Sequence, residues 1–177
     1  MRLFTAINFD EPTKDTLTDI IHTLKDAAHT GSFTSRQNLH LTLVFIGEVA
    51  QPHVHDIKIA MERIEEKPFI LDLGGTGSFV RDSGEIFWVG AYKSRALLSV
   101  RDQLNERLVQ AGCAVEMREF KPHLTLAREL SLDAGFDREH LAKEVGAIRM
   151  PVKSIDLMRS ERIDGVLTYT RIHSKWL

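Results

Sequence analysis

The sequence predicts an α+β protein with two similar lobes, each an antiparallel-rich sheet with helices, related by a pseudo-twofold axis around a central cleft. Two observations predict this fold. The tetrapeptide His-Leu-Thr-Leu occurs twice, at 40–43 and 123–126. Around each copy the residues follow one order of strand, helix, strand, helix and strand. The chain has 177 residues, which is enough to bury a hydrophobic core. We therefore expect one bilobal domain over 1–177, with sequence repeats of approximately 1–83 and 84–177.

The first repeat alternates β-type and helix-type segments. Pro12 suits the first turn of a helix that opens at Asp10, and apolar residues at helical spacing follow it. Pro68 ends a second helix that starts near Pro52. The predicted elements are a strand at 2–9, a helix from 10 to 28, a strand at 40–47, a helix from 52 to 67 and a strand at 69–73.

The second repeat follows the same order about 83 residues later. Ser94 is a suitable N-cap for a helix that Gly112 ends. The predicted elements are a strand at 86–92, a helix from 94 to 112, a strand from 123, a helix at 137–145 and a strand at 151–159, with an extra strand at 167–175. The glycine-rich stretch 74–78 lacks the lysine and the strand–loop–helix context of a phosphate loop. We expect it to be a flexible connection between β segments.

The repeated tetrapeptide carries the candidate chemistry. In an extended strand alternate side chains share a face, so each copy places His and Thr together and both leucines opposite. Histidines on two sides of a phosphorus atom can act as general base and general acid, and threonine hydroxyls can donate to the phosphate oxygens. A lone strand histidine is more often structural, but packing alone would need only the leucines. The candidate catalytic residues are therefore His40 and His123, with Thr42 and Thr125 as phosphate-binding residues.

The two copies differ five residues after each histidine. Arg128 follows the second copy, and its guanidinium matches two phosphate oxygens. We expect Arg128 to bind the phosphate, with a solvated strand-end charge as the alternative. Phe45 follows the first copy and lies two and four residues after Leu43 and Leu41. In a strand these three side chains would share a face, so we expect Phe45 in the core.

Other candidate groups favour structural or surface roles. His53 and His55 face different ways on a helix and have no third ligand close in sequence, so we expect no metal site and no cofactor. Arg118 and Lys121 are expected to be solvated, although they lie just before the second motif and could attract a phosphate. Four aromatic residues are expected in the core rather than as base-stacking platforms: Phe9, Phe79, Trp88 and Tyr92.

Composition narrows the class of protein. The formal net charge of −2 gives no broad electrostatic footprint for long nucleic acid, although it leaves nucleotides and nucleic-acid ends open. The single cysteine, Cys113, cannot form an internal disulfide, and we expect it to be packed or idle. No apolar run is long enough to span a bilayer, and acidic residues come too early for a secretion signal. We expect a cytoplasmic monomer that does not contact membranes.

The segments 38–47, Asn-Leu-His-Leu-Thr-Leu-Val-Phe-Ile-Gly, and 121–128, Lys-Pro-His-Leu-Thr-Leu-Ala-Arg, resemble the two signature strands of the two-histidine (2H) phosphoesterases. More narrowly, they resemble RNA 2′,3′-cyclic phosphodiesterases, also called 2′-5′ RNA ligases. The likeness extends over nearly the whole chain. It implies a bilobal 2H phosphoesterase domain whose two His/Thr pairs line the cleft, with Arg128 assisting at the phosphate.

The resemblance also implies a reaction. It is the hydrolysis of 2′,3′-cyclic phosphate ends of RNA or nucleotides to 2′-phosphomonoesters without metal, together with the reverse-type joining of RNA ends through a 2′-5′ bond. We expect His123 to activate water and His40 to protonate the 3′ oxygen. Two alternatives stay open. One is a cyclic phosphodiesterase for a small nucleotide such as ADP-ribose cyclic phosphate, and the other is a non-catalytic module that binds RNA ends.

Overall fold

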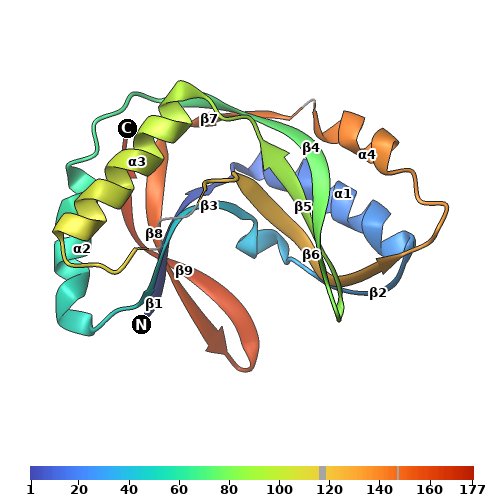
Figure 1. Ribbon diagram of the computed structural model, residues 1–177, viewed down its shortest axis with the longest axis horizontal. Coiled ribbons are helices and arrows are strands. Elements are labelled where there is room, and N and C mark those ends of the chain that lie inside the picture. The colour runs from blue at the N-terminus through green and yellow to red at the C-terminus, as the bar shows by residue number, and fades with distance from the viewer. Residues whose placement is uncertain (116–118, 147) are drawn as a thin grey trace.

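The computed structural model describes residues 1–115, 119–146 and 148–177. It has the α+β architecture that the sequence predicts, with two antiparallel sheets (Figure 1). The first sheet has the order β3 (His40–Glu48), β1 (Arg2–Asn8), β8 (Ser154–Ile163) and β9 (Val166–Trp176). The second has the order β2 (Ala28–Phe33), β6 (His123–Leu132), β5 (Gly84–Ala91), β4 (Phe69–Arg81) and β7 (Arg149–Val152). No helix in these described ranges is both long and apolar enough to cross a membrane.

The helices cover the two sheets in pairs (Figure 1). The helices α2 (Val54–Glu62) and α3 (Arg95–Gln110) pack together beside the first sheet. The helices α1 (Glu11–Asp26) and α4 (Arg138–Val145) flank the second sheet. Each helix buries an apolar stripe, and these stripes join the inner faces of both sheets in one hydrophobic cluster.

Strands of the two sequence repeats pair with each other in both sheets. Strand β4 ends the first repeat and lies beside β5, whereas β8, from the second repeat, lies beside β1. Each sheet therefore takes strands from both 1–83 and 84–177, so the sheets do not coincide with the sequence repeats. Strand order depends on pairing between distant segments, which a local residue pattern does not encode.

The predicted starts of two helices, at Asp10 and Ser94, are confirmed by N-cap hydrogen bonds. Asp10 Oδ1 accepts a hydrogen bond from the Thr13 N–H at 3.0 Å, and Ser94 Oγ accepts one from the Leu97 N–H at 3.1 Å. Each side chain satisfies a backbone donor that the helix leaves unpaired. The helix predicted from Pro52 is shorter than expected: a 3-10 turn, η2 (Gln51–His53), leads into α2, which ends at Glu62.

Two predictions about the strands are wrong, and one strand was missed. The glycine-rich stretch 74–78 is no flexible connection, because it lies inside the long strand β4. A Cβ on Gly74 would overlap the ring of Tyr92, and one on Gly77 would overlap the ring of Trp88. These two glycines thus make room for aromatic rings on β5 and the segment after it. The strand predicted at 151–159 is two strands, β7 and β8, which belong to different sheets, and β2 was not predicted.

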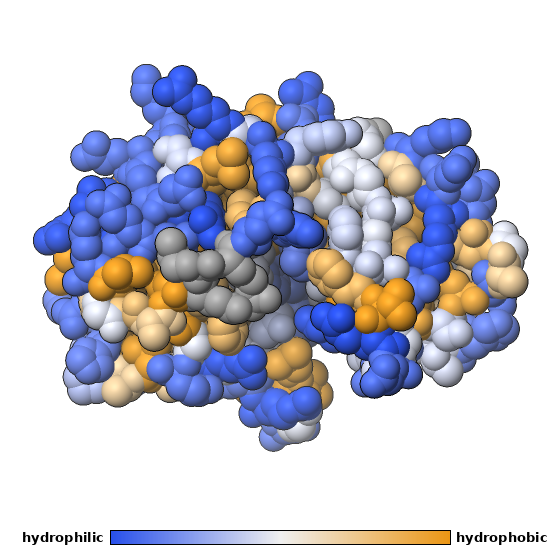
Figure 2. All heavy atoms as spheres, viewed as in Figure 1, coloured by the Kyte–Doolittle hydropathy of each residue, from blue (hydrophilic) through white to orange (hydrophobic). Residues whose placement is uncertain are grey.

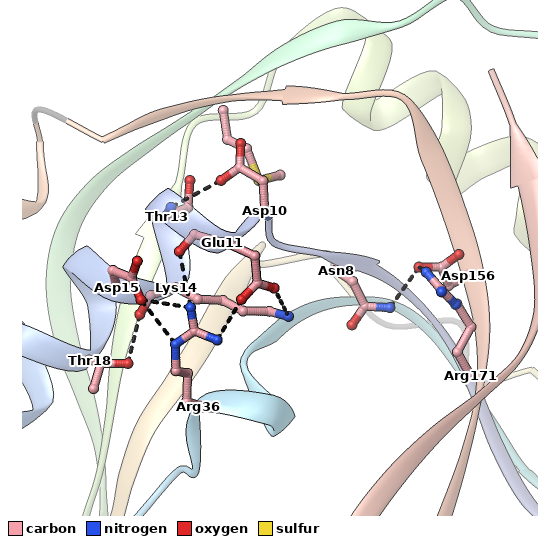
Figure 3. Close-up of polar contacts among 11 residues, drawn as sticks. Asn8, Asp10, Glu11, Thr13, Lys14, Asp15, Thr18, Arg36, Asp156 and Arg171 are labelled. Atoms are coloured by element: carbon pink, nitrogen blue, oxygen red, sulfur yellow. Dashed lines mark hydrogen bonds and ion pairs between the residues drawn. The ribbon is translucent and has the colours of Figure 1, made fainter.

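A short 3-10 turn, η1 (Arg36–Asn38), leads directly into β3 and is fastened to α1. The Arg36 guanidinium donates to Glu11 Oε2 and to Asp15 Oδ1, each at 2.6 Å (Figure 3). The Arg36 hydrogen bond is the main reason that the pKa of Glu11 is lowered. The chain therefore enters β3 from an anchored turn.

The single thiol, Cys113, is partly buried and packs against the hydrophobic cluster, and burial raises the pKa of this thiol. A raised pKa keeps the thiol protonated and poorly nucleophilic. This environment agrees with the expectation of a packed or idle cysteine.

Candidate active site

The two tetrapeptides lie on β3 and β6 with the predicted alternation. Leu41, Leu43, Leu124 and Leu126 are buried in the hydrophobic cluster. His40, Thr42, His123 and Thr125 are partly exposed and line one cleft of about 1110 Å³. Strands β3 and β6 also contact each other, although they belong to different sheets. Figure 2 shows a hollow between the two halves of the molecule on this face.

All five predicted site residues line this cleft, because Arg128 joins the two His/Thr pairs there. Further lining residues come from the segment around β2, from β1 and β3, and from the β8–β9 hairpin: Arg2, Phe4, Ser32, Phe33, Thr34, Ser35, Asn38, Phe45, Glu48, Ser160, Glu161, Arg162, Val166, Leu167 and Tyr169. The cleft is thus built from both sheets of a single chain.

His40 is held tightly on its ring nitrogens. Its Nδ1 lies 2.7 Å from the carbonyl oxygen of Asn38, and its Nε2 lies 3.0 Å from Thr42 Oγ1. A carbonyl only accepts hydrogen bonds, so Nδ1 carries the proton and neutral His40 receives the Thr42 hydroxyl at Nε2. The rings of Phe4 and Tyr169 stand 4.9 and 5.0 Å from the His40 ring.

These surroundings lower the pKa of His40. Burial is the largest cause, since it disfavours the charged ring, and the positive charges of Arg128 and His123 act in the same direction. The hydrogen bond to the Asn38 carbonyl opposes them, because it stabilises the protonated form. The charge effects also place His123 and Arg128 within electrostatic reach of His40.

His123 has the same tautomer in a more open setting. Its Nδ1 lies 2.6 Å from the carbonyl oxygen of Lys121, so Nδ1 again carries the proton. Its Nε2 has no hydrogen-bond partner among the residues that the structure describes. The rings of Phe79 and Trp88 stand 5.5 and 5.9 Å from the imidazole. The two histidines thus share one backbone contact but differ in solvent access and in the second ring nitrogen.

β-Bulges explain where Phe45 and Arg128 lie. The pairing of β1 with β3 shifts between Thr5 and Ala6, which leaves an extra residue in β3 after Thr42. An extra residue reverses the alternation of the side chains that follow it. The prediction of Phe45 in the core is therefore wrong: its side chain is 40% exposed and lines the cleft. The pairing of β5 with β6 shifts in the same way between Phe87 and Trp88, which leaves an extra residue in β6 after Thr125. Arg128 therefore turns to the cleft.

The sequence model of one protein family, the 2′-5′ RNA ligase superfamily, matches residues 12–164. This chain belongs to that superfamily. The match covers both tetrapeptide strands and most of the two sheets.

Three relatives place the chain within the superfamily. An RNA 2′,3′-cyclic phosphodiesterase of Aeropyrum pernix is 38% identical over 59% of this chain, and the match spans 63% of that relative. One of Methanothermobacter thermautotrophicus is 28% identical over 96% of this chain and 95% of its own length. The crystal structure of Escherichia coli LigT complexed with NADP⁺ is 27% identical and has a TM-score of 0.80, covering 99% of this chain and 96% of that one.

Sequence reasoning missed several residues of the cleft. Those around β2 were missed because that strand has no clear β pattern, and Arg2 and Tyr169 were missed because they lie outside the repeated tetrapeptide. Arg2 Cζ lies 5.1 Å from the centre of the Phe45 ring. Arg118 lies outside the described residues, and the Lys121 side chain is exposed beside Glu119.

The remaining aromatic and histidine predictions have mixed outcomes. Phe9 is in the core, as expected, but Tyr92 is exposed. Phe79 and Trp88 flank His123 instead of lying in the core cluster. His53 Nδ1 lies 3.7 Å from Asp56 Oδ2 at the exposed start of α2.

Proposed function

We propose that this protein is an RNA 2′,3′-cyclic phosphodiesterase, which hydrolyses 2′,3′-cyclic phosphate ends to 2′-phosphomonoesters and also joins RNA ends through a 2′-5′ bond. One observation carries the proposal: two His/Thr pairs from different sheets line one cleft, and each imidazole keeps its proton on Nδ1. Nε2 of each ring is then the nitrogen that can exchange a proton with substrate or water, and on His40 it also lies 3.0 Å from Thr42 Oγ1. The relatives named RNA 2′,3′-cyclic phosphodiesterase support the substrate class.

The hydrolysis needs one proton acceptor and one proton donor. His123 Nε2 takes a proton from water as the water oxygen attacks phosphorus. The bond between phosphorus and O3′ breaks, and His40 donates its Nε2 proton to O3′. The products are a 2′-phosphomonoester and a free 3′ hydroxyl. Proton exchange with solvent then restores neutral His123 and protonated His40.

The different settings of the two histidines support this assignment. The open Nε2 of His123 suits contact with water, whereas the Nε2 of His40 is engaged by Thr42. The lowered pKa of His40 favours its neutral form in the free enzyme. A bound phosphate anion opposes both the burial effect and the charge of Arg128, so it raises the pKa of His40. In this mechanism, His40 gains its catalytic proton as substrate binds.

Phosphate charge is held by groups that line the same cleft. The Arg128 guanidinium offers two parallel donors to non-bridging oxygens, and the Thr125 hydroxyl adds one donor; the Thr42 hydroxyl adds another once His40 is protonated and no longer accepts its proton. Donors that are already in place stabilise the charge that develops in the transition state. We propose that the reaction needs no metal and that the protein is cytoplasmic. We also propose that the domain over 1–177 works as a monomer, because one chain supplies both halves of the site.

A small nucleotide such as ADP-ribose cyclic phosphate is the second candidate substrate. The NADP⁺ complex of LigT supports it, since a relative binds a dinucleotide. The cleft of about 1110 Å³ slightly exceeds the usual range of about 300–1,000 Å³ for small-molecule sites, which favours an RNA end. Relative kcat/KM values for the two substrates in competition will separate the candidates.

The test is product analysis with an RNA oligonucleotide that ends in a 2′,3′-cyclic phosphate, incubated with the purified protein and a chelator. We expect a 2′-phosphomonoester, identified by ³¹P NMR. His40→Ala and His123→Ala should each lower kcat by about 10²–10⁴-fold, because each removes one proton-transfer group. Full activity in either variant would refute the mechanism. Tight binding without turnover in the wild type would instead support a non-catalytic module that binds RNA ends.

A further inference from the structure

Asn38 has a side chain that closes the free edge of β9. Its amide Nδ2 donates to the Leu167 carbonyl at 2.8 Å, and its Oδ1 accepts from the Tyr169 N–H at 3.2 Å. A carbonyl and the N–H two residues later point to one side of a strand, so this amide pairs as a residue of a parallel partner strand would. Asn38 is only 7% exposed. Both functions of a buried amide are therefore used to bind one edge strand.

The backbone of the same residue controls His40. The Asn38 carbonyl accepts the Nδ1 proton of His40 at 2.7 Å, which selects the ring tautomer and fixes the ring plane. The Asn38 amide oxygen also holds Tyr169, whose ring stands edge-on to His40 at 5.0 Å with an interplanar angle of 88°. One residue thus sets both the hydrogen bond on His40 and an aromatic wall beside it.

The turn that contains Asn38 is anchored at its other end as well. Arg36 ties η1 to the first turns of α1 through Glu11 and Asp15 (Figure 3). Exposed ion pairs contribute little to stability one by one, but this one is a multidentate contact on a three-residue turn. The Asn38 carbonyl is consequently held from α1 on one side and from β9 on the other.

The second histidine provides an internal comparison. Lys121 occupies the position equivalent to Asn38, and its carbonyl accepts the Nδ1 proton of His123 at 2.6 Å. The Lys121 side chain is 67% exposed and lies 3.8 Å from Glu119. The carbonyl contact therefore forms without an anchored side chain, so the clamp by Asn38 is a feature of the His40 side alone.

We propose that Asn38 is a positioning residue for His40. Its clamped side chain fixes the carbonyl that selects the His40 tautomer and keeps Tyr169 against the same ring. The kinetic consequence rests on the proposed function, whereas the effect on the imidazole does not. The charged groups that face His40 are His123 and Arg128 of β6, and Tyr169 of β9 is its other titratable neighbour. Changing Asn38 removes none of these three groups, although Tyr169 loses its hydrogen bond to the Asn38 side chain.

The experiment reads the His40 imidazole directly by ¹H–¹⁵N NMR across a pH titration, with the signal assigned by its loss in His40→Gln. Asn38→Ala should convert the Nδ1–H tautomer to a mixture and move the titration midpoint to lower pH, because a loosened carbonyl stabilises the charged ring less. Asn105→Ala is the matched control, since Asn105 is a buried asparagine, 4% exposed, on α3 and away from the cleft. It should change neither property.

Kinetics with the cyclic-phosphate oligonucleotide form the second arm. Asn38→Ala should lower kcat by about 10–100-fold through misplacement of His40, with KM changed by no more than about 2-fold because the groups that the mechanism assigns to the phosphate, Thr42, Thr125 and Arg128, are kept. If Asn38→Ala does not fold, Asn38→Asp decides, since it keeps the bond from Tyr169 and loses the bond to Leu167; its tautomer mixture should be intermediate.

The results distinguish a failure of the positioning role from a failure of the proposed function. A wild-type tautomer and midpoint in folded Asn38→Ala, with only the loss of stability that Asn105→Ala also shows, would overturn the positioning role. A wild-type tautomer in Asn38→Asp would overturn it equally where Asn38→Ala does not fold. Absence of turnover in the wild type would contradict the proposed function, but the NMR result would still decide this inference.

Discussion

The Trp88 ring beside His123 gives a prediction that tests how packing supports the site. Gly77 lies directly opposite Trp88 across β4 and β5, and the Trp88 ring stands 5.9 Å from the His123 ring. A Cβ at position 77 would lie 2.9 Å from Trp88 Cε2 and closer to the far edge of the indole, whereas ordinary contact begins at 3.4 Å. In Gly77→Ala the indole must therefore move by about 0.5 Å at Cε2 and by more beyond it.

The expected cost has two parts. Overpacking of this size lowers the free energy of unfolding by about 1–3 kcal/mol, which for a chain of this length lowers Tm by about 2–12 °C. A shift of the ring against His123 should also lower kcat by about 10-fold, because a misplacement of about 1 Å can cost about 100-fold. Thermal unfolding followed by circular dichroism and steady-state hydrolysis measure the two effects.

Gly75→Ala is the matched control for this substitution. Gly75 has a φ of +71°, and no atom lies within 4 Å of the place that an added Cβ would take. Alanine there costs about 1–2 kcal/mol of backbone strain and touches no aromatic ring, so we expect it to lower Tm and keep kcat. A normal kcat in Gly77→Ala would refute the supporting role of Trp88, and an equal loss of kcat in Gly75→Ala would trace the effect to general destabilisation of β4.

Three further predictions concern the phosphate group, the bulge and the pH dependence of stability. Arg128→Lys should raise KM by about 10-fold, because a point charge replaces a two-donor fork; initial rates over a range of substrate concentrations will measure it. Phe45→Ala should cost less than about 1 kcal/mol in urea unfolding, whereas Leu43→Ala should cost about 2–5 kcal/mol, since only Leu43 is buried. The pKa of His40 is lowered on folding, so the unfolded chain takes up a proton there first. The free energy of unfolding should therefore fall as the pH drops below about 6.5, and His40→Gln should flatten that fall in urea titrations.

Sequence reasoning succeeded where a feature depends on residues close together along the chain. The caps at Asp10 and Ser94 form within one helical turn, and the alternation that turns His40 and Thr42 away from Leu41 needs only three consecutive residues. It failed where a second strand decides the outcome. The glycines of β4 look flexible until the rings of Trp88 and Tyr92 are placed over them, and the two strands β7 and β8 separate because their partners, β4 and β1, lie in different sheets.

The bulges show why strict alternation misplaces two equivalent residues. Phe45 and Arg128 both lie five residues after a histidine, so strict alternation would place both beside the buried leucines. Phe45 was predicted in the core by that rule, whereas Arg128 was predicted at the phosphate from its charge, against the rule. An extra residue after each His/Thr pair turns both side chains to the cleft. Each repeated strand therefore brings a His, a Thr and the residue five positions after the His to the cleft, and this third residue, aromatic on β3 and cationic on β6, makes a nearly symmetric site chemically unequal.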